Sequence, residues 1–99
     1  MSSFYTRPYY SLKDAITVSN GANFGGLGLS AITVQTVGIV PGDIVQIFRS
    51  NDGENWVQDG TNITTNTITD LTPGAVYYRA RLNAIAGGGA VNAVFAGAS

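Results

Sequence analysis

The two carboxylate side chains that lie closest together in this sequence, Asp52 and Glu54, belong to the segment 51–55, Asn-Asp-Gly-Glu-Asn. Clustered carboxylate and amide oxygens are the ligands that Ca²⁺ takes, and two neighbouring carboxylates could also act as the acid and base of a glycosidase. No bidentate carboxylate follows at calcium-loop spacing, and neither Asp52 nor Glu54 has apolar neighbours in the sequence. Because Asp-Gly tolerates the positive φ of a hairpin, Asp52 and Gly53 are predicted to form a structural turn.

The composition removes most other chemistry. The 99 residues include no His and no Cys, which excludes Ser-His-Asp and Cys-His nucleophiles and His- or Cys-based metal sites. The lone lysine, Lys13, follows Leu12 and precedes Asp14, and we interpret it as a solvated ion. The glycine clusters at 25–28 and 87–89 precede no helix, so they are not phosphate loops. We therefore expect no enzyme activity, no cofactor and no metal.

The charge pattern excludes further partners. Five basic and six acidic residues are spread along the chain, and Arg79 and Arg81 form the only close basic pair. Nucleic-acid binding needs clustered basic residues, and membrane binding needs a long apolar or polybasic segment, so neither partner is expected. Only 11% of residues are charged, against about 25% in an average domain. Sparse charge is typical of surfaces that are buried in protein interfaces.

Aromatic residues are concentrated at the N-terminus. Four of the first ten residues are Phe or Tyr, and together they could bury roughly 800 Å², the area that one partner contributes to a standard interface. Residues 1–11 are predicted to form an extended arm over a neighbouring subunit; the alternative is a first strand packed on its own domain. With the glycine-rich loop at 20–28, this predicts the following interface residues: Phe4, Tyr5, Arg7, Tyr9, Tyr10, Phe24 and Leu27.

The remaining chain, residues 12–99, is predicted to be one β-sandwich domain. Short β-branched runs alternate with turn signals, and no apolar pattern has helical spacing over several turns. The predicted strands cover residues 15–19, 29–37, 44–50, 55–58, 62–70, 76–84 and 90–96. Seven or eight such strands make an all-β fold, an antiparallel two-sheet sandwich.

Two segments carry a resemblance to a known family. Residues 71–84, with a Leu-x-Pro-Gly-x-x-Tyr run before an Arg-x-Arg strand, resemble the corner between the fifth and sixth strands of fibronectin type III domains. The resemblance implies that Pro73-Gly74 forms the turn and that Tyr77 is the corner tyrosine. Residues 47–56 are similar to the strand, Asp-Gly turn and Trp hairpin of the same fold. Trp56 is interpreted as a core or core-edge residue.

The chain is rich in Gly, Ala, Thr and Asn and has a Ser-x-Asp-Gly-x-x-Trp hairpin at 50–56 and an Arg-x-Arg strand. With these features it also resembles the small accessory proteins of tailed-phage virions. That resemblance implies a non-enzymatic capsid decoration (cement) protein that binds the major capsid protein. It further implies a homotrimer, assembled in the host cytoplasm and located on the capsid surface. The absence of Cys and of a signal-peptide pattern fits intracellular assembly.

Three other interpretations remain open. A carbohydrate-binding module would use Trp56, Tyr78 or the tyrosines of the arm as stacking platforms. A phage tail or fibre accessory domain would share the composition and the fold. A fibronectin-like spacer in a larger assembly would behave as a stable monomer.

Overall fold

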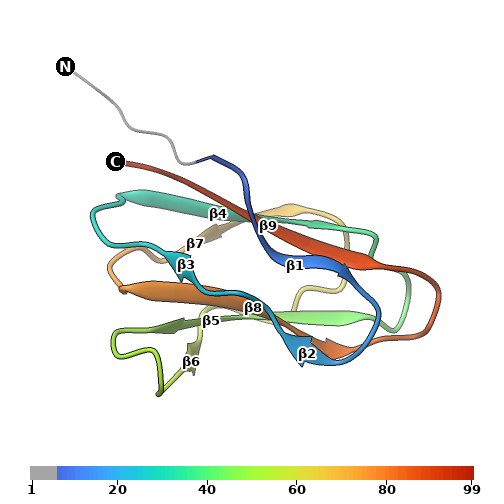
Figure 1. Ribbon diagram of the computed structural model, residues 1–99. Helices are drawn as coiled ribbons and strands as arrows, with labels where there is room; N and C mark the ends of the chain where they lie inside the picture. The colour runs from blue at the N-terminus through green and yellow to red at the C-terminus, as the bar shows by residue number, and fades with distance from the viewer. Residues whose placement is uncertain (1–6) are drawn as a thin grey trace.

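The computed structural model describes residues 7–99, which form two antiparallel β-sheets packed face to face as a sandwich (Figure 1). The nine strands, in chain order, are β1 Tyr9–Ala15, β2 Ser19–Asn20, β3 Phe24–Gly25, β4 Ala31–Val37, β5 Ile44–Ser50, β6 Val57–Gln58, β7 Ile68–Leu71, β8 Tyr77–Ala84 and β9 Val91–Ala98. One sheet has the order β1-β9-β4-β7. The other has the order β2-β8-β5-β6, with β3 also paired to β8. No helix that could cross a membrane occurs within residues 7–99.

The two central strands of the first sheet show why this sequence forms a sandwich. In β4, Ile32, Val34 and Thr36 are buried and alternate with more exposed residues, because successive side chains point to opposite faces of a sheet. Strand β9 alternates in the same way and pairs with β4 along the whole length of β4. The inward-facing residues of both sheets form one core.

Sixteen hydrophobic residues make up this core. They are Leu12, Phe24, Ile32, Val34, Ile39, Val45, Ile47, Ile63, Leu71, Ala75, Tyr78, Ala80, Leu82, Val91, Ala93 and Phe95. Strands from both sheets contribute to the list, so the core lies between the sheets, as the alternation predicts. Its largest fully buried side chains are Tyr78 and Phe95.

Residues 19–25 run beside β8 as an interrupted edge, with β2 and β3 separated by a bend. The glycines in this stretch and just after it allow close packing. A Cβ on Gly21 would collide with the backbone of Ser11, and a Cβ on Gly26 would collide with the ring of Tyr78. Part of the segment predicted as a glycine-rich loop, residues 20–28, is therefore packed against the sandwich.

The structure corrects the predicted start of the domain. The boundary between arm and sandwich was placed after residue 11, but Tyr9 already pairs with Phe95 and Tyr10 with Val94. The strand predicted at 15–19 is also wrong, because β1 ends at Ala15 and the following residues are exposed up to Val18. Strand β1 contains register shifts, which are common at sheet edges.

The strand order differs from that of the family that residues 71–84 resemble. In immunoglobulin-type sandwiches the last strand lies beside the penultimate one in the same sheet. Here the last strand, β9, lies between β1 and β4, in the opposite sheet from β8. The all-β antiparallel sandwich is confirmed, whereas the strand order does not support a fibronectin type III assignment.

Candidate functional site

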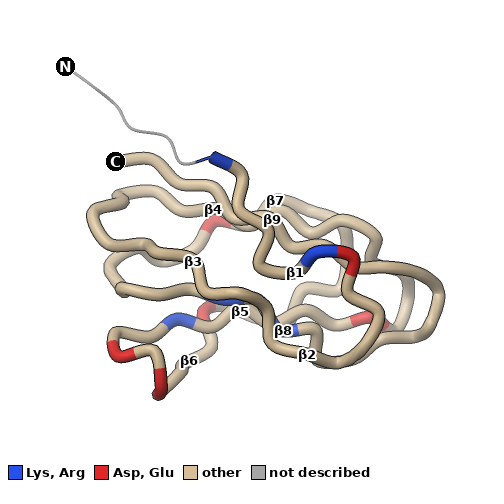
Figure 2. The backbone as a smooth tube through the Cα atoms, in the orientation of Figure 1, with Lys and Arg blue, Asp and Glu red and all other residues tan. Residues whose placement is uncertain are grey.

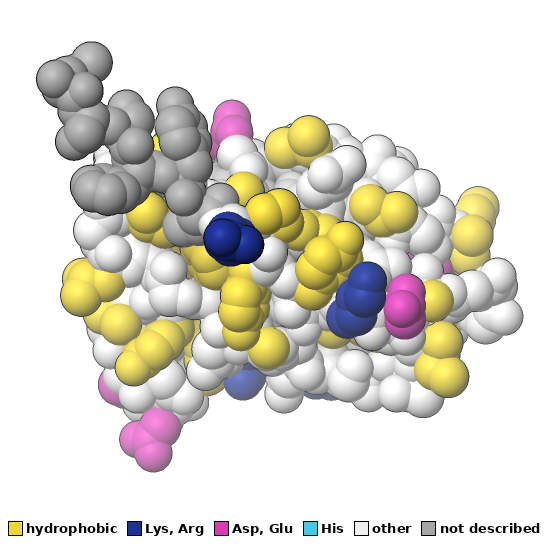
Figure 3. All heavy atoms as spheres, turned by 45° about the horizontal axis from the view of Figure 1, so that its top comes forward, with side chains coloured by type: hydrophobic (Ala, Val, Ile, Leu, Met, Phe, Trp, Pro, Cys, Tyr) yellow, Lys and Arg dark blue, Asp and Glu magenta, His cyan; other side chains and the backbone are white. Residues whose placement is uncertain are grey.

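The outer surface of the β1-β9-β4-β7 sheet is the first candidate interaction surface, and we call it the β9 face. Its two central strands, β4 and β9, contain no charged residue. Its outward-facing side chains are Tyr10, Ala31, Thr33, Gln35, Val37, Ile68, Asp70, Asn92, Val94, Ala96 and Ala98. Figure 3, which turns this side forward, shows hydrophobic side chains spread between a few charged ones.

Register brings several of these residues into one row across the sheet. Val94 pairs with Tyr10 on one side and with Gln35 on the other, and Gln35 pairs in turn with Ile68. Ile68 is 64% exposed and Tyr10 is 44% exposed. Beside this row, small side chains around Thr33 line a shallow, mostly apolar hollow of about 190 Å³. The central strands of the face are uncharged, and its side chains are accessible to another protein.

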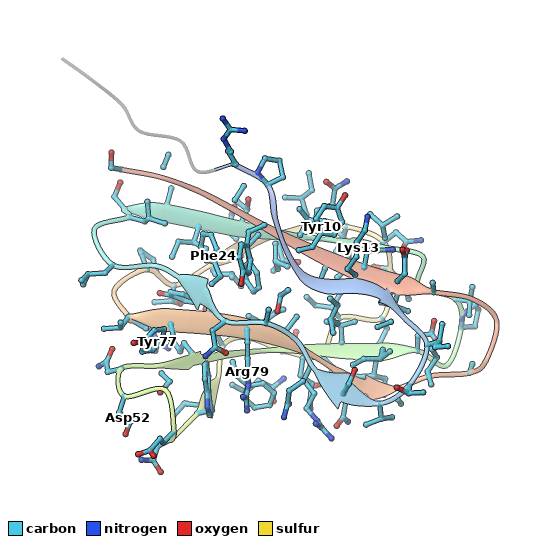
Figure 4. All side chains as sticks on the ribbon, in the orientation of Figure 1. Tyr10, Lys13, Phe24, Asp52, Tyr77 and Arg79 are labelled. Atoms are coloured by element: carbon cyan, nitrogen blue, oxygen red, sulfur yellow. The ribbon has the colours of Figure 1, made fainter. Side chains whose placement is uncertain are left out.

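The predicted arm residues separate into distinct environments. Tyr10 lies on the β9 face, with the Lys13 ammonium 4.2 Å from its ring centroid, as the labels in Figure 4 show. Tyr9 points the other way, and its ring lies 5.6 Å from that of Phe24. Arg7 is exposed. The predicted interface residues Phe4 and Tyr5 lie outside the described residues.

Phe24 and Leu27, both predicted as interface residues, have opposite environments. Phe24 is only 4% exposed, and its ring stacks on that of Phe95 with centroids 5.2 Å apart. The prediction for Phe24 is therefore wrong, because the aromatic contacts place it in the core. Leu27 is 78% exposed and remains available for contact.

The structure also corrects the corner tyrosine, which is Tyr78 and not Tyr77. The Tyr78 hydroxyl donates a hydrogen bond to the Thr72 carbonyl at 2.7 Å and accepts one from the Ala75 N–H at 3.1 Å. Tyr77 is 36% exposed and points outward. Through these two hydrogen bonds Tyr78 links β8 to the loop that contains Pro73 and Gly74.

Asp52 organises the connection between β5 and β6. Its carboxylate accepts hydrogen bonds from the Ser50 hydroxyl, the Glu54 N–H and both the backbone and side-chain N–H groups of Asn55, all at 2.8–2.9 Å. Gly53 follows with a positive φ of 77°. The bonds from Asn55 lower the pKa of Asp52 well below its usual value, followed by those from Glu54 and Ser50. The carboxylate therefore holds a turn together.

Asp52→Asn is expected to lower the melting temperature near neutral pH. A folded-state pKa below the unfolded value, about 3.9, means that the ionised Asp52 stabilises the fold above about pH 4 and loses this effect as pH falls further. The difference in melting temperature between wild type and variant should therefore narrow below pH 4. Thermal unfolding from pH 2 to 7 measures it. Glu54→Gln is the matched control, and a difference that does not change with pH would contradict the assignment.

Trp56 is half-buried and stacks with an arginine of the second sheet. The guanidinium carbon of Arg79 lies 4.1 Å from the ring centroid of Trp56. One face of the indole is therefore covered by a cation, and the fully buried Tyr78 offers no ring surface to a ligand. These environments do not favour Trp56 or Tyr78 as a stacking platform for a sugar ring.

Two buried polar residues position the elements and were missed by the sequence analysis. The Ser11 hydroxyl donates to the Ala22 carbonyl and accepts from the Ala80 N–H, so it links β1 to the second sheet. Asp43, only 1% exposed, accepts hydrogen bonds from the N–H groups of Val40 and Ala86. Ala80 lies 69 positions from Ser11, and Ala86 lies 43 positions from Asp43, so no local sequence signal could have identified these two bonds.

Within residues 7–99, no group of three or more His, Cys, Asp or Glu side chains is placed to hold a metal ion. The chain is an antiparallel two-sheet sandwich with solvent-exposed residues on its outer faces. One of three comparisons with known proteins found a protein of similar fold. No protein-family model matches it, and a comparison with curated protein sequences found no match. Among solved structures, it is similar to the crystal structure of the SPBc2 prophage-derived protein YomS. The TM-score is 0.85 at 12% sequence identity, over 100% of this chain and 96% of that one.

Proposed function

We propose that this chain is a non-enzymatic structural protein of a phage particle, which decorates the capsid by burying the β9 face against the major capsid protein. The observation that carries the proposal is the uncharged centre of that face, since β4 and β9 contain no charged residue. Interface cores are depleted of charge in the same way. The fold likeness to a prophage-derived protein supports the phage setting.

The β9 face alone is smaller than a standard protein interface, so other parts of the chain must contribute to capsid binding. Four strands of 7, 8, 7 and 4 residues, about 4.8 Å apart and at about 3.3 Å per residue, form a surface of roughly 400 Å². A standard interface takes about 800 Å² from each partner. We expect the N-terminal aromatics Phe4 and Tyr5 to supply part of the difference, and self-association into a trimer to multiply weak contacts through avidity.

Thr33→Lys tests the face directly. Thr33 lies near its centre, between Ala96 and Asp70 in the register. A lysine there can pair with Asp70 within the folded sheet, and it still places a long, charged side chain in the proposed contact. We expect binding to undecorated capsid shells to weaken at least about tenfold, or about 1.4 kcal/mol. Co-sedimentation of the purified chain with shells lacking it measures this affinity.

Thr61→Lys, in the exposed connection between β6 and β7, makes the same chemical change away from the face and is the control. Removing residues 1–6 leaves all of β1 in place and should weaken binding while the unfolding midpoint stays unchanged. Equal sedimentation of wild type and Thr33→Lys would refute the contact. A strict monomer in light scattering with no affinity for shells would refute the decoration function.

A further inference from the structure

The outer surface of the second sheet has a different chemistry, and we call it the β8 face. It is defined by Gln46 and Phe48 of β5, Trp56 before β6, and Tyr77, Arg79 and Arg81 of β8. Register places Phe48 opposite Arg79, and Gln46 opposite Arg81. Figure 4 shows the Arg79 side chain on the side of the sheet away from Phe24. Arg, Trp, Tyr and Phe are the residue types enriched in protein interfaces.

Arg79 is fixed in place but incompletely satisfied. Its guanidinium stacks on Trp56 at 4.1 Å, which restricts the side chain, while its Nε is buried and has no hydrogen-bond partner. Desolvation, followed by the nearby positive charge of Arg81, lowers the pKa of Arg79. An arginine held over an indole ring has less conformational freedom to lose when it binds a planar anion.

The positive charge on this face has no acidic counterpart. Arg81 donates to the amide oxygens of Asn20, at 3.0 Å, and Asn83, at 3.4 Å. The outward-facing positions of β2, β5, β6 and β8 carry no Asp or Glu in the described chain. Figure 2 shows the acidic residues of the β5–β6 connection beyond the end of these strands. The positive charges of Arg79 and Arg81, two residues apart on β8, repel each other, and an external anion would reduce that repulsion.

Three side-chain amides near the two arginines hydrogen-bond to one another. The Nε2 groups of Gln46 and Gln58 both donate to Oδ1 of Asn62, at 3.1 and 3.0 Å. The polar side chains around the two arginines are thereby held in a fixed arrangement, and they supply no negative charge. A ligand for this surface must therefore bring the charge itself.

We propose that the β8 face binds a carboxylate-bearing segment of a partner protein. The guanidinium groups of Arg79 and Arg81 would pair with Asp or Glu side chains, and the rings of Phe48, Trp56 and Tyr77 would supply apolar contact. Arginine recognises carboxylates through two parallel hydrogen bonds. Two arginines are too few for a phosphate backbone, whose binding depends on many neutralised charges. This inference does not depend on the β9 face or on any capsid.

The chain contains its own reporter, because Trp56 is the only tryptophan. Titrating the full chain with poly-L-glutamate at low salt should change the tryptophan fluorescence in a saturable way. Arg81→Gln leaves the stack of Arg79 on Trp56 in place and should weaken the binding at least about fivefold. The single substitution Arg79→Gln should weaken the binding more than Arg81→Gln does. Arg7→Gln removes one exposed charge outside the strands and is the matched control, expected to bind like the wild type.

The side-chain Nε–H resonance of Arg79 gives a second readout, and it should shift on binding while circular dichroism shows that each variant is folded. The absence of a saturable change would overturn the proposal. So would equal weakening by Arg7→Gln, because binding would then be non-specific. Tighter binding to duplex DNA than to poly-L-glutamate at the same salt would also overturn it in favour of a nucleic-acid ligand. Because no shell is present, failure of the capsid experiment leaves this result unaffected.

Discussion

Phe24→Ala is expected to reduce the free energy of unfolding by about 3–5 kcal/mol, the usual cost of removing a buried phenylalanine ring. The ring is 4% exposed and stacks on the ring of Phe95. It also contacts the ring of Tyr9, with the two centroids 5.6 Å apart. Truncation leaves a cavity between β1, β3 and β9 that these rigid rings cannot fill. Urea denaturation followed by circular dichroism measures the loss.

Leu27→Ala is the matched control, because Leu27 lies three residues away and is 78% exposed. We expect it to change stability by no more than about 0.5 kcal/mol. The pair thus separates core packing from surface availability within one segment. A loss below about 1 kcal/mol for Phe24→Ala, or equal losses for both variants, would contradict the core position of Phe24.

The sequence allowed the strands and turns of the sandwich to be predicted where the signals are local. The run at 44–50 coincides with β5, and the alternation around Ile32 and Val34 coincides with β4. The strand order could not be predicted, because β1 and β9 come from opposite ends of the chain. No local pattern states which of several antiparallel partners a strand will take.

The candidate site was predicted less well, for a related reason. Phe24 lies in the glycine-rich loop at 20–28 and is predicted as an interface residue, yet Gly26 is where the chain passes close to the ring of Tyr78. Glycine-rich sequence indicates either a mobile loop or close backbone packing, and only the fold distinguishes the two. The stacking of Arg79 on Trp56 likewise joins residues whose proximity depends on the β5–β6 and β5–β8 pairings.

The two outer faces of the sandwich differ in charge, and they therefore suit different partners. The β9 face has an uncharged centre and suits apolar burial, whereas the β8 face presents two uncompensated arginines. Because they lie on opposite sides of one core, a substitution on the surface of one is expected to leave the other unchanged. A chain of this kind could contact a shell on one side and an acidic partner on the other.

The sequence does contain a signal that places Tyr78, and not Tyr77, on the inner face of β8. Arg79 and Arg81 favour the outer face of their strand, and Ala80 and Leu82 favour the core. The period of two then places Tyr78 inside with Ala80 and Leu82. The family resemblance favoured Tyr77 instead. A shift of one residue reverses the face of every side chain in a strand, so the two assignments make opposite predictions for stability.

Tyr78→Phe is therefore expected to lower the free energy of unfolding by about 1–3 kcal/mol, because it leaves the buried Ala75 N–H and the Thr72 carbonyl without this partner. The hydroxyl makes both bonds, to Thr72 and Ala75, from a side chain that is fully buried. Tyr77→Phe removes the same atom from the adjacent exposed ring and should change stability by no more than about 0.5 kcal/mol. Chemical denaturation of the two variants, together with amide hydrogen exchange at Ala75, measures the difference. Faster exchange at Ala75 in Tyr78→Phe alone is the expected pattern, whereas a larger loss in Tyr77→Phe would return the corner to the residue that the resemblance implied.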